Sequence, residues 1–312
     1  MSTVADLPAP VGLPTRPRAT FGRVLASEWS KAWGLRSTRW AAAVMVLLTT
    51  GLVYLSGIGS QVGPEGYGSL AYFVTSTLVI TQFPILLLGV LLGSGEFSSR
   101  SAGPTFVAVP SRTPVLLAKA LVTVLALGVL IGATEYPAGA SRSTFLAVPR
   151  RVPVLAAQGL TVAAAAALTA VAALGVTFLA ILPLRGELVL ALDPSDPEAT
   201  RMLGGFVLYL VGSALLGTAL GTLARGPAAG LVAGVVLVFL LEQIVVLLGA
   251  SWLVAALPGW AGRLAVASDA GAAQNAAQAG VGITPWLGLG VMAVWVVVLF
   301  LVAAVRLRRS SI

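Results

Sequence analysis

The sequence predicts an all-α integral membrane protein with about six transmembrane helices, one extra or re-entrant apolar segment, and an N-terminal amphipathic helix in the membrane interface. Three observations support this class. Hydrophobic residues make up 58% of the 312-residue chain and charged residues only 10%. Mean hydropathy is +0.98. The surface of a soluble globular protein would need a far larger share of charged residues. The apolar residues also fall in runs long enough to cross a bilayer.

Missing residue types and motifs exclude several kinds of chemistry. The chain has no Cys and no His, which rules out disulfides, thiol chemistry, His-ligated metals and His-based acid–base catalysis. It has no GxxxxGK[ST] phosphate loop, so it cannot hydrolyse ATP by that route. We therefore expect neither a cofactor nor an enzymatic activity. The net charge is +8. The basic residues lie beside apolar runs, a pattern that indicates membrane orientation and not nucleic-acid binding.

The chain is expected to form one domain that contains a duplication. Residues 1–19 are rich in Pro and lack the apolar region of a signal peptide, which predicts a disordered cytoplasmic tail. Residues 20–312 form a single transmembrane domain. Within it, 88–121 aligns with 127–160, and 17 of the 34 pairs are identical. Such similarity indicates a tandem repeat of one apolar helix followed by one basic loop.

Residues 20–40 predict the interfacial helix. On a helical wheel Trp29 and Trp33 fall on an apolar side and Lys31 falls on a polar side, as in helices that lie in the headgroup region. Glu28 is the exception, because it lies on the apolar arc. It either pairs with Lys31 or snorkels to water, or it contacts a partner or another helix.

Seven apolar runs are long enough to span a bilayer. They cover residues 41–59, 70–95, 114–134, 153–183, 203–224, 228–249 and 285–305. The segment 251–284 is too polar to span around 268–278. It is expected to form short helices at the outer face, in part re-entrant.

The cations predict the topology. Sixteen of 19 Lys and Arg residues lie in the N-terminal region, the two repeat loops, the Arg225 turn and the C-terminal tail, and the others are Arg185, Arg201 and Arg263. The positive-inside rule places those five regions, including both chain ends, in the cytoplasm at the plasma membrane. Two cytoplasmic ends require an even number of crossings. We therefore expect six complete crossings, with one irregular segment in the duplicated region.

Small residues recur every fourth position on two of the predicted spans, a spacing that lets helices approach closely. They are Ser213, Gly217 and Gly221 on one span, and Gly230 and Gly234 on the next. Such faces serve either intrachain packing or an interface with a second copy of the chain.

A carboxylate stands inside one predicted span. Glu242 and the adjacent Gln243 lie in the run VFLLEQIVVLL, and ionisable residues at membrane depth are costly. The functional interpretation is that the pair lines a substrate path or binds a cationic group of a cargo. The structural interpretation is that Glu242 is protonated or paired with a polar group on a neighbouring helix.

The second repeat loop, EYPAGASRSTFLAVPRR, carries a motif that the first copy has only in part. Together with SEWSKAWGLRSTRW near the N-terminus and the basic C-terminal end, it resembles the permease subunit of a type 2 ATP-binding-cassette (ABC) exporter of the actinobacterial kind. The residues that match the family pattern are Glu135, Tyr136, Gly139, Arg142, Thr144, Ala147, Pro149, Arg150 and Arg151. The first copy departs from it at Arg100, Gly103 and Ser111.

The resemblance implies a six-helix ABC transporter permease with an N-terminal elbow helix and a coupling helix in this loop that touches a separate cytoplasmic ATPase. A second permease copy, identical or different, is implied as well. The extra repeat unit is not part of the family pattern. An alternative for Arg142, Arg150 and Arg151 is that they only orient the flanking spans.

Two functions follow as expectations. The first is an ATP-driven exporter of a hydrophobic or amphipathic cargo such as an antibiotic, drug, peptide or lipid. The second is a proton-coupled secondary transporter that uses Glu242 as its carrier.

Overall fold

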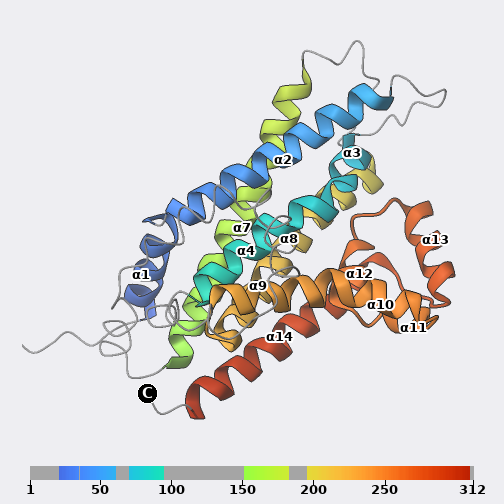
Figure 1. Cartoon of the computed structure of the whole chain (residues 1–312). Helices are drawn as coiled ribbons and strands as arrows, with labels where there is room; N and C mark the ends of the chain where they lie inside the picture. Colours follow the sequence, from blue (N-terminus) through green and yellow to red (C-terminus); the bar gives the residue numbers. More distant parts are fainter. Residues whose placement is uncertain (1–20, 35, 61–69, 95–150, 183–194, 310–312) are drawn as a thin grey trace, which may run out of the picture.

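A computed structural model describes residues 21–34, 36–60, 70–94, 151–182 and 195–309 (Figure 1). Most of these residues are helical and none lies in a strand, which confirms the predicted all-α class for this part of the chain. The elements are, in order, α1 (Phe21–Gly34), α2 (Arg36–Ser60), α3 (Leu70–Ser76), α4 (Leu78–Ser94), α7 (Arg151–Ile181), α8 (Pro197–Ala224), α9 (Pro227–Val235), the π-helical turn η4 (Val236–Leu240), α10 (Leu241–Leu247), α11 (Ser251–Val254), α12 (Pro258–Arg263), α13 (Asp269–Ala279) and α14 (Pro285–Arg309).

Five helical stretches of the described chain are long and apolar enough to cross a membrane. They are Thr38–Ser56, Pro153–Ile181, Pro197–Ala224, Pro227–Leu247 and Pro285–Leu307. Large apolar side chains point outward from them, and Leu47, Leu179 and Leu301 are 68%, 63% and 60% exposed. Soluble proteins rarely expose apolar surface on this scale, so these outward faces are suited to lipid.

The predicted run 70–95 forms two helices instead of one. The break lies at Thr77, whose hydroxyl donates to the Val74 carbonyl at 2.7 Å. Ser76 likewise donates to a carbonyl three residues earlier, at 2.7 Å. Such bonds compete with the helical backbone pattern, and Pro84 removes a further backbone donor within α4. As a result α4 has 17 residues and is shorter than the five candidate spans.

One predicted boundary was wrong by more than a turn, because α8 begins at Pro197 and not at 203. The acidic residue before it acts as a cap: Asp196 Oδ1 accepts a hydrogen bond from the Glu198 N–H at 2.9 Å. Proline suits the first helical position. At its other end α8 stops at Arg225, which takes up a left-handed conformation with φ 54°.

Helix α8 is the centre of the bundle and packs against α3, α4, α7, α9, α12 and α14. Its closest neighbour is α4. A Cβ atom added at Gly217 would clash with the Leu86 carbonyl oxygen, and one added at Gly89 would clash with the Ala214 carbonyl oxygen. Glycines on both helices therefore allow the two backbones to touch.

The second predicted small-residue face, on α9, also packs within the chain. A Cβ atom at Gly230 would lie 2.8 Å from Gly221 Cα, and one at Gly234 would lie 3.0 Å from the Leu86 side chain. The intrachain interpretation is thus confirmed for these glycines.

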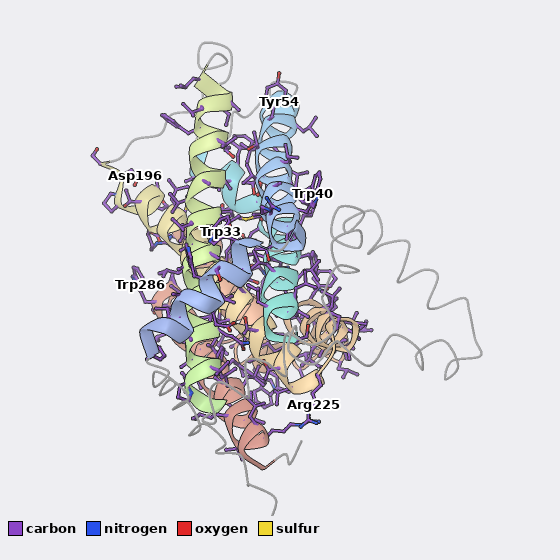
Figure 2. All side chains as sticks on the ribbon, turned by 90° about the vertical axis from the view of Figure 1, so that its left-hand side faces the viewer. Trp33, Trp40, Tyr54, Asp196, Arg225 and Trp286 are labelled. Carbon is purple, nitrogen blue, oxygen red and sulfur yellow. The ribbon has the colours of Figure 1, made fainter. Side chains whose placement is uncertain are left out.

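Several helix ends gather at one end of the bundle. We call it the basic end, because Arg151, Arg225 and Arg306 belong to the helix ends that meet there. There Leu155 in the first turns of α7 packs with Leu307 of α14 and Leu223 of α8, and α1 packs against α7. Arg225 lies at this end and Tyr54 of α2 at the opposite one (Figure 2). The helices of the described chain thus run between two distinct ends.

The residues that flank the segment 95–150 both belong to the basic end. Gly93, near the end of α4, accepts a hydrogen bond from Thr222 of α8 at 3.1 Å, and Arg151 is the first residue of α7. The predicted run 114–134 lies outside the described residues.

The segment predicted to form short helices, 251–284, contains α11, α12 and α13. Helix α12 enters the bundle and packs against α8, α14 and η4. Gly259, Ala261 and Gly262 of α12 are buried. The short helices expected here are thus present, and α12 brings a charged residue toward the interior of the bundle.

Candidate functional site

The predicted coupling loop lies almost wholly outside the described residues. This applies to Glu135, Tyr136, Gly139, Arg142, Thr144, Pro149 and Arg150. Arg151 is described as the first residue of α7. The loop motif therefore ends where a transmembrane helix begins.

The predicted interfacial residues lie on α1. Leu25 packs against α7, and Glu28 is 6% exposed, so Glu28 lies on a side of α1 that faces the bundle. This geometry favours contact with another helix. Trp29 is exposed, and its ring centre lies 5.9 Å from that of Trp33. Of Lys31 only the backbone is described.

Four buried polar side chains and one partly buried arginine meet where α4, α8, α10 and α12 come together. We call them the Tyr209 cluster; they are Gln82, Tyr209, Ser213, Glu242 and Arg263. The first four are at most 2% exposed. The Tyr209 hydroxyl donates to Gln82 Oε1 and lies close to the Ser213 and Arg263 side chains. Burying such groups is unfavourable unless they hydrogen-bond to one another.

Glu242 and Arg263 form an ion pair within the cluster. Arg263 Nη2 donates to Glu242 Oε2. Because arginine stays protonated in proteins, the carboxylate has a permanent counter-charge. Of the interpretations left open by the sequence, pairing with a neighbouring polar group is what the structure shows, and Arg263 is the partner.

A π-helical turn aims Glu242 into the cluster. The turn η4 directly precedes α10, and the Leu241 N–H bonds to the Val236 carbonyl, five residues back. In an uninterrupted α-helix each step of four residues rotates the side chain by about 40°. The wider π turn offsets this drift, so Gly234, Val238 and Glu242 are all buried.

Gln243 does not belong to this site. Its side chain is exposed, whereas that of the preceding Glu242 is buried. The two side chains therefore face different sides of the helix, because neighbouring helix positions point in directions about 100° apart.

Two glycines let α12 reach the cluster. A Cβ atom at Gly259 would clash with Glu242 Oε1, and one at Gly262 would lie 2.8 Å from both the Tyr209 ring and Met292 Sδ. Neither position has room for a larger residue. Because α12 packs this closely, Arg263, which follows Gly262, reaches its carboxylate partner Glu242.

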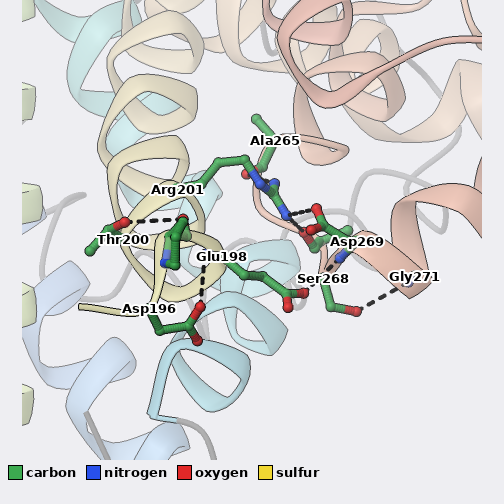
Figure 3. Close-up of polar contacts among 10 residues, drawn as sticks. Asp196, Glu198, Thr200, Arg201, Ala265, Ser268, Asp269 and Gly271 are labelled. Atoms are coloured by element: carbon green, nitrogen blue, oxygen red, sulfur yellow. Dashed lines mark hydrogen bonds and ion pairs between the residues drawn. The ribbon is translucent and has the colours of Figure 1, made fainter. Parts of the chain in front are cut away.

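A second network, which we call the Arg201 network, holds the chain after α12 to the start of α8 (Figure 3). Arg201 donates to the carbonyl oxygens of Ala265 and Ala267, each at 2.9 Å, and to Asp269 Oδ1 at 2.8 Å. Glu198 Oε1 accepts a hydrogen bond from the Asp269 N–H at 2.7 Å. The α12 segment is therefore attached at two places, each of which uses an arginine.

Neither attachment was predicted from the sequence. Arg201 and Arg263 stood out only as cations away from the five basic regions. A signal was present in the spacing of Gly259 and Gly262, since small residues permit close helix approach. Nothing in the sequence indicated which acid each arginine would meet.

The cluster combines one carboxylate with one guanidinium and is electrically neutral, so it can bind hydrogen-bonding groups and tie α10 to α12. No group of three or more potential metal ligands occurs among the described residues. No protein-family model, curated protein or solved structure matches this chain. Its function is therefore inferred from its residues and fold.

Proposed function

We propose that this chain is the permease subunit of an ATP-driven ABC exporter that moves a hydrophobic or amphipathic cargo across the plasma membrane. A separate ATPase subunit supplies the energy, and a second permease copy completes the transporter. The apolar helices support a membrane role. The loop motif from Glu135 to Arg151 and its resemblance to exporter permeases support the rest.

The observation that carries the proposal is the continuity between the loop motif and α7. Arg151 ends the motif and begins a helix of 31 residues. At 1.5 Å per residue such a helix is about 46 Å long, whereas the hydrocarbon core of a bilayer is about 30 Å thick. Helix α7 is therefore long enough to project beyond the core and to carry a displacement of its first turn through the membrane as a rigid rod.

The packing at the basic end supports the same role. Leu25 of α1 packs against the start of α7, and Leu155 of α7 packs with Leu307 of α14. Arg306 donates to the Leu223 carbonyl at the end of α8 at 2.7 Å. A push on α7 would therefore reach α1, α8 and α14 together. We assign this end and both chain termini to the cytoplasm, where cations accumulate.

The secondary transporter remains the second candidate because Glu242 is buried at membrane depth. Its ion pair with Arg263 gives the carboxylate a structural role that needs no proton transport. Transport that survives ATP depletion and stops in Glu242→Gln would favour this candidate. Transport that ends with ATP depletion favours the exporter.

Combining Glu135→Ala with Arg142→Ala is expected to reduce cargo export and copurification of a phosphate-loop ATPase, because it removes two charged residues of the coupling motif. Membrane insertion should be unchanged, since the apolar spans are intact. The matched control is Glu96→Ala with Arg100→Ala in the first copy, which should do less. Equal losses would contradict the assignment of coupling to the second copy, and wild-type protein that copurifies with no such ATPase would contradict the proposed function.

A further inference from the structure

We infer that the Tyr209 cluster is a binding site for a small, neutral, hydrogen-bonding group, namely a hydroxyl supplied by water or by an amphipathic alcohol. The inference rests on the geometry of the cluster and does not require the proposed coupling to an ATPase. Its starting point is a set of buried polar atoms that make no hydrogen bond of normal geometry within the protein.

Three atoms of the cluster are buried and have no hydrogen bond of normal geometry: Ser213 Oγ, Glu242 Oε1 and Arg263 Nη1. The Tyr209 hydroxyl lies close to the Ser213 and Arg263 side chains, and the Trp260 backbone amide lies close to the Glu242 carboxylate. Neither makes a hydrogen bond of normal geometry to the three atoms. Leaving such a group unsatisfied costs about 1–3 kcal/mol. Native proteins commonly place water or a ligand at these positions.

The three atoms define the chemistry of the partner. The carboxylate oxygen accepts, the guanidinium nitrogen donates, and the serine hydroxyl does both. A hydroxyl group, which also donates and accepts, can satisfy all of these kinds of atom. A charged ligand suits the site poorly, because Glu242 and Arg263 already neutralise each other and the ligand would lose its hydration for no net attraction.

Among the five side chains of the cluster, only that of Arg263 is partly exposed. The Arg263 side chain is 23% exposed, whereas Gln82, Tyr209, Ser213 and Glu242 are at most 2% exposed. The arginine is therefore the side on which the cluster is open to its surroundings. In the exporter proposed above, the same position would receive a hydroxyl of the cargo, and this extension alone depends on the proposed function.

Hydroxyl-radical footprinting of the purified full chain in detergent tests the site, because radiolysis of bound water oxidises side chains beside it even when they are buried. Met292 Sδ and the Tyr209 ring each lie 2.8 Å from the position of a Cβ atom added at Gly262, so they flank the same point. Met292 is 2% exposed, whereas Met45 is 0% exposed in the apolar core. We expect Met292 to be oxidised several-fold faster than Met45. Equal rates would overturn the inference.

A pair of serine and threonine variants makes the test specific. Ser213→Ala removes one partner of the bound group, so the Met292 rate should fall toward that of Met45. Thr218→Ala removes another fully buried hydroxyl on α8, one that bonds within its own helix to the Ala214 carbonyl at 2.9 Å, and should leave the Met292 rate unchanged. Equal responses to the two variants would also overturn the inference.

Adding 1-octanol separates the two sources of the hydroxyl. If the Met292 rate falls relative to that of Met45, the alcohol has displaced water, and the site accepts the hydroxyl of an amphiphile. If the ratio stays high, the site is selective for water. Neither arm requires ATP or a partner protein.

Discussion

Replacing Arg263 with alanine is expected to destabilise the bundle by about 3–5 kcal/mol, the range for removing one partner of a buried ion pair. The variant leaves Glu242, which is 2% exposed, without its counter-charge. It also removes a neighbour of the Tyr209 hydroxyl. The measurement is the thermal unfolding midpoint, Tm, of the purified protein in detergent, and a large decrease is expected.

Two controls identify the cause of that decrease. Combining Arg263→Met with Glu242→Leu removes both charges, so the double variant should be more stable than Arg263→Ala despite carrying more changes. Arg201→Ala removes an arginine whose carboxylate partner, Asp269, is 72% exposed, so its effect should be smaller. A Tm for Arg263→Ala equal to that of the wild type would show that the ion pair does not hold α12 in place.

Enlarging Gly89 to valine is expected to separate α4 from α8. Its side chain would have to enter space occupied by the backbone of Ala214. Overpacking commonly costs about 1–3 kcal/mol, and here the obstacle is backbone, which cannot change rotamer. We expect a marked loss of monodisperse protein in fluorescence-detected size-exclusion chromatography.

Gly175→Val is the matched control for this prediction. Gly175 lies in α7 with no atom near a Cβ added there, so the same side chain would point outward into free space. The control should elute like the wild type. Similar profiles for the two variants would show that close packing of α4 on α8 is not required for folding.

The helices could be predicted where apolar runs are long and uniform. The run 153–183 corresponds to α7 (Arg151–Ile181), and 285–305 corresponds to α14 (Pro285–Arg309). The early start of α8 was missed because its first turn, Pro197 to Thr200, is polar, and a polar stretch before an apolar run predicts a loop. The break at Thr77 was missed because side-chain hydroxyls, which bond locally to the backbone, decide it within an apolar run.

The candidate site could be predicted only in part. Glu242 was singled out because a carboxylate at membrane depth is costly. Its partner Arg263 lies in a segment that the charge pattern assigned to the outer face. Their meeting depends on the entry of α12 into the bundle and on the π turn η4, which arise from tertiary packing.

We propose that the loop motif around Tyr136 faces the cytosol, where a separate ATPase binds it. The chain has no cysteine, so Tyr136→Cys creates a single reactive site for a membrane-impermeant maleimide. Gln274→Cys, at an exposed position on α13, serves as the control for the opposite side. We predict that position 136 is labelled in inside-out vesicles and not in intact cells, and that position 274 shows the reverse. Labelling of position 136 in intact cells would contradict the account.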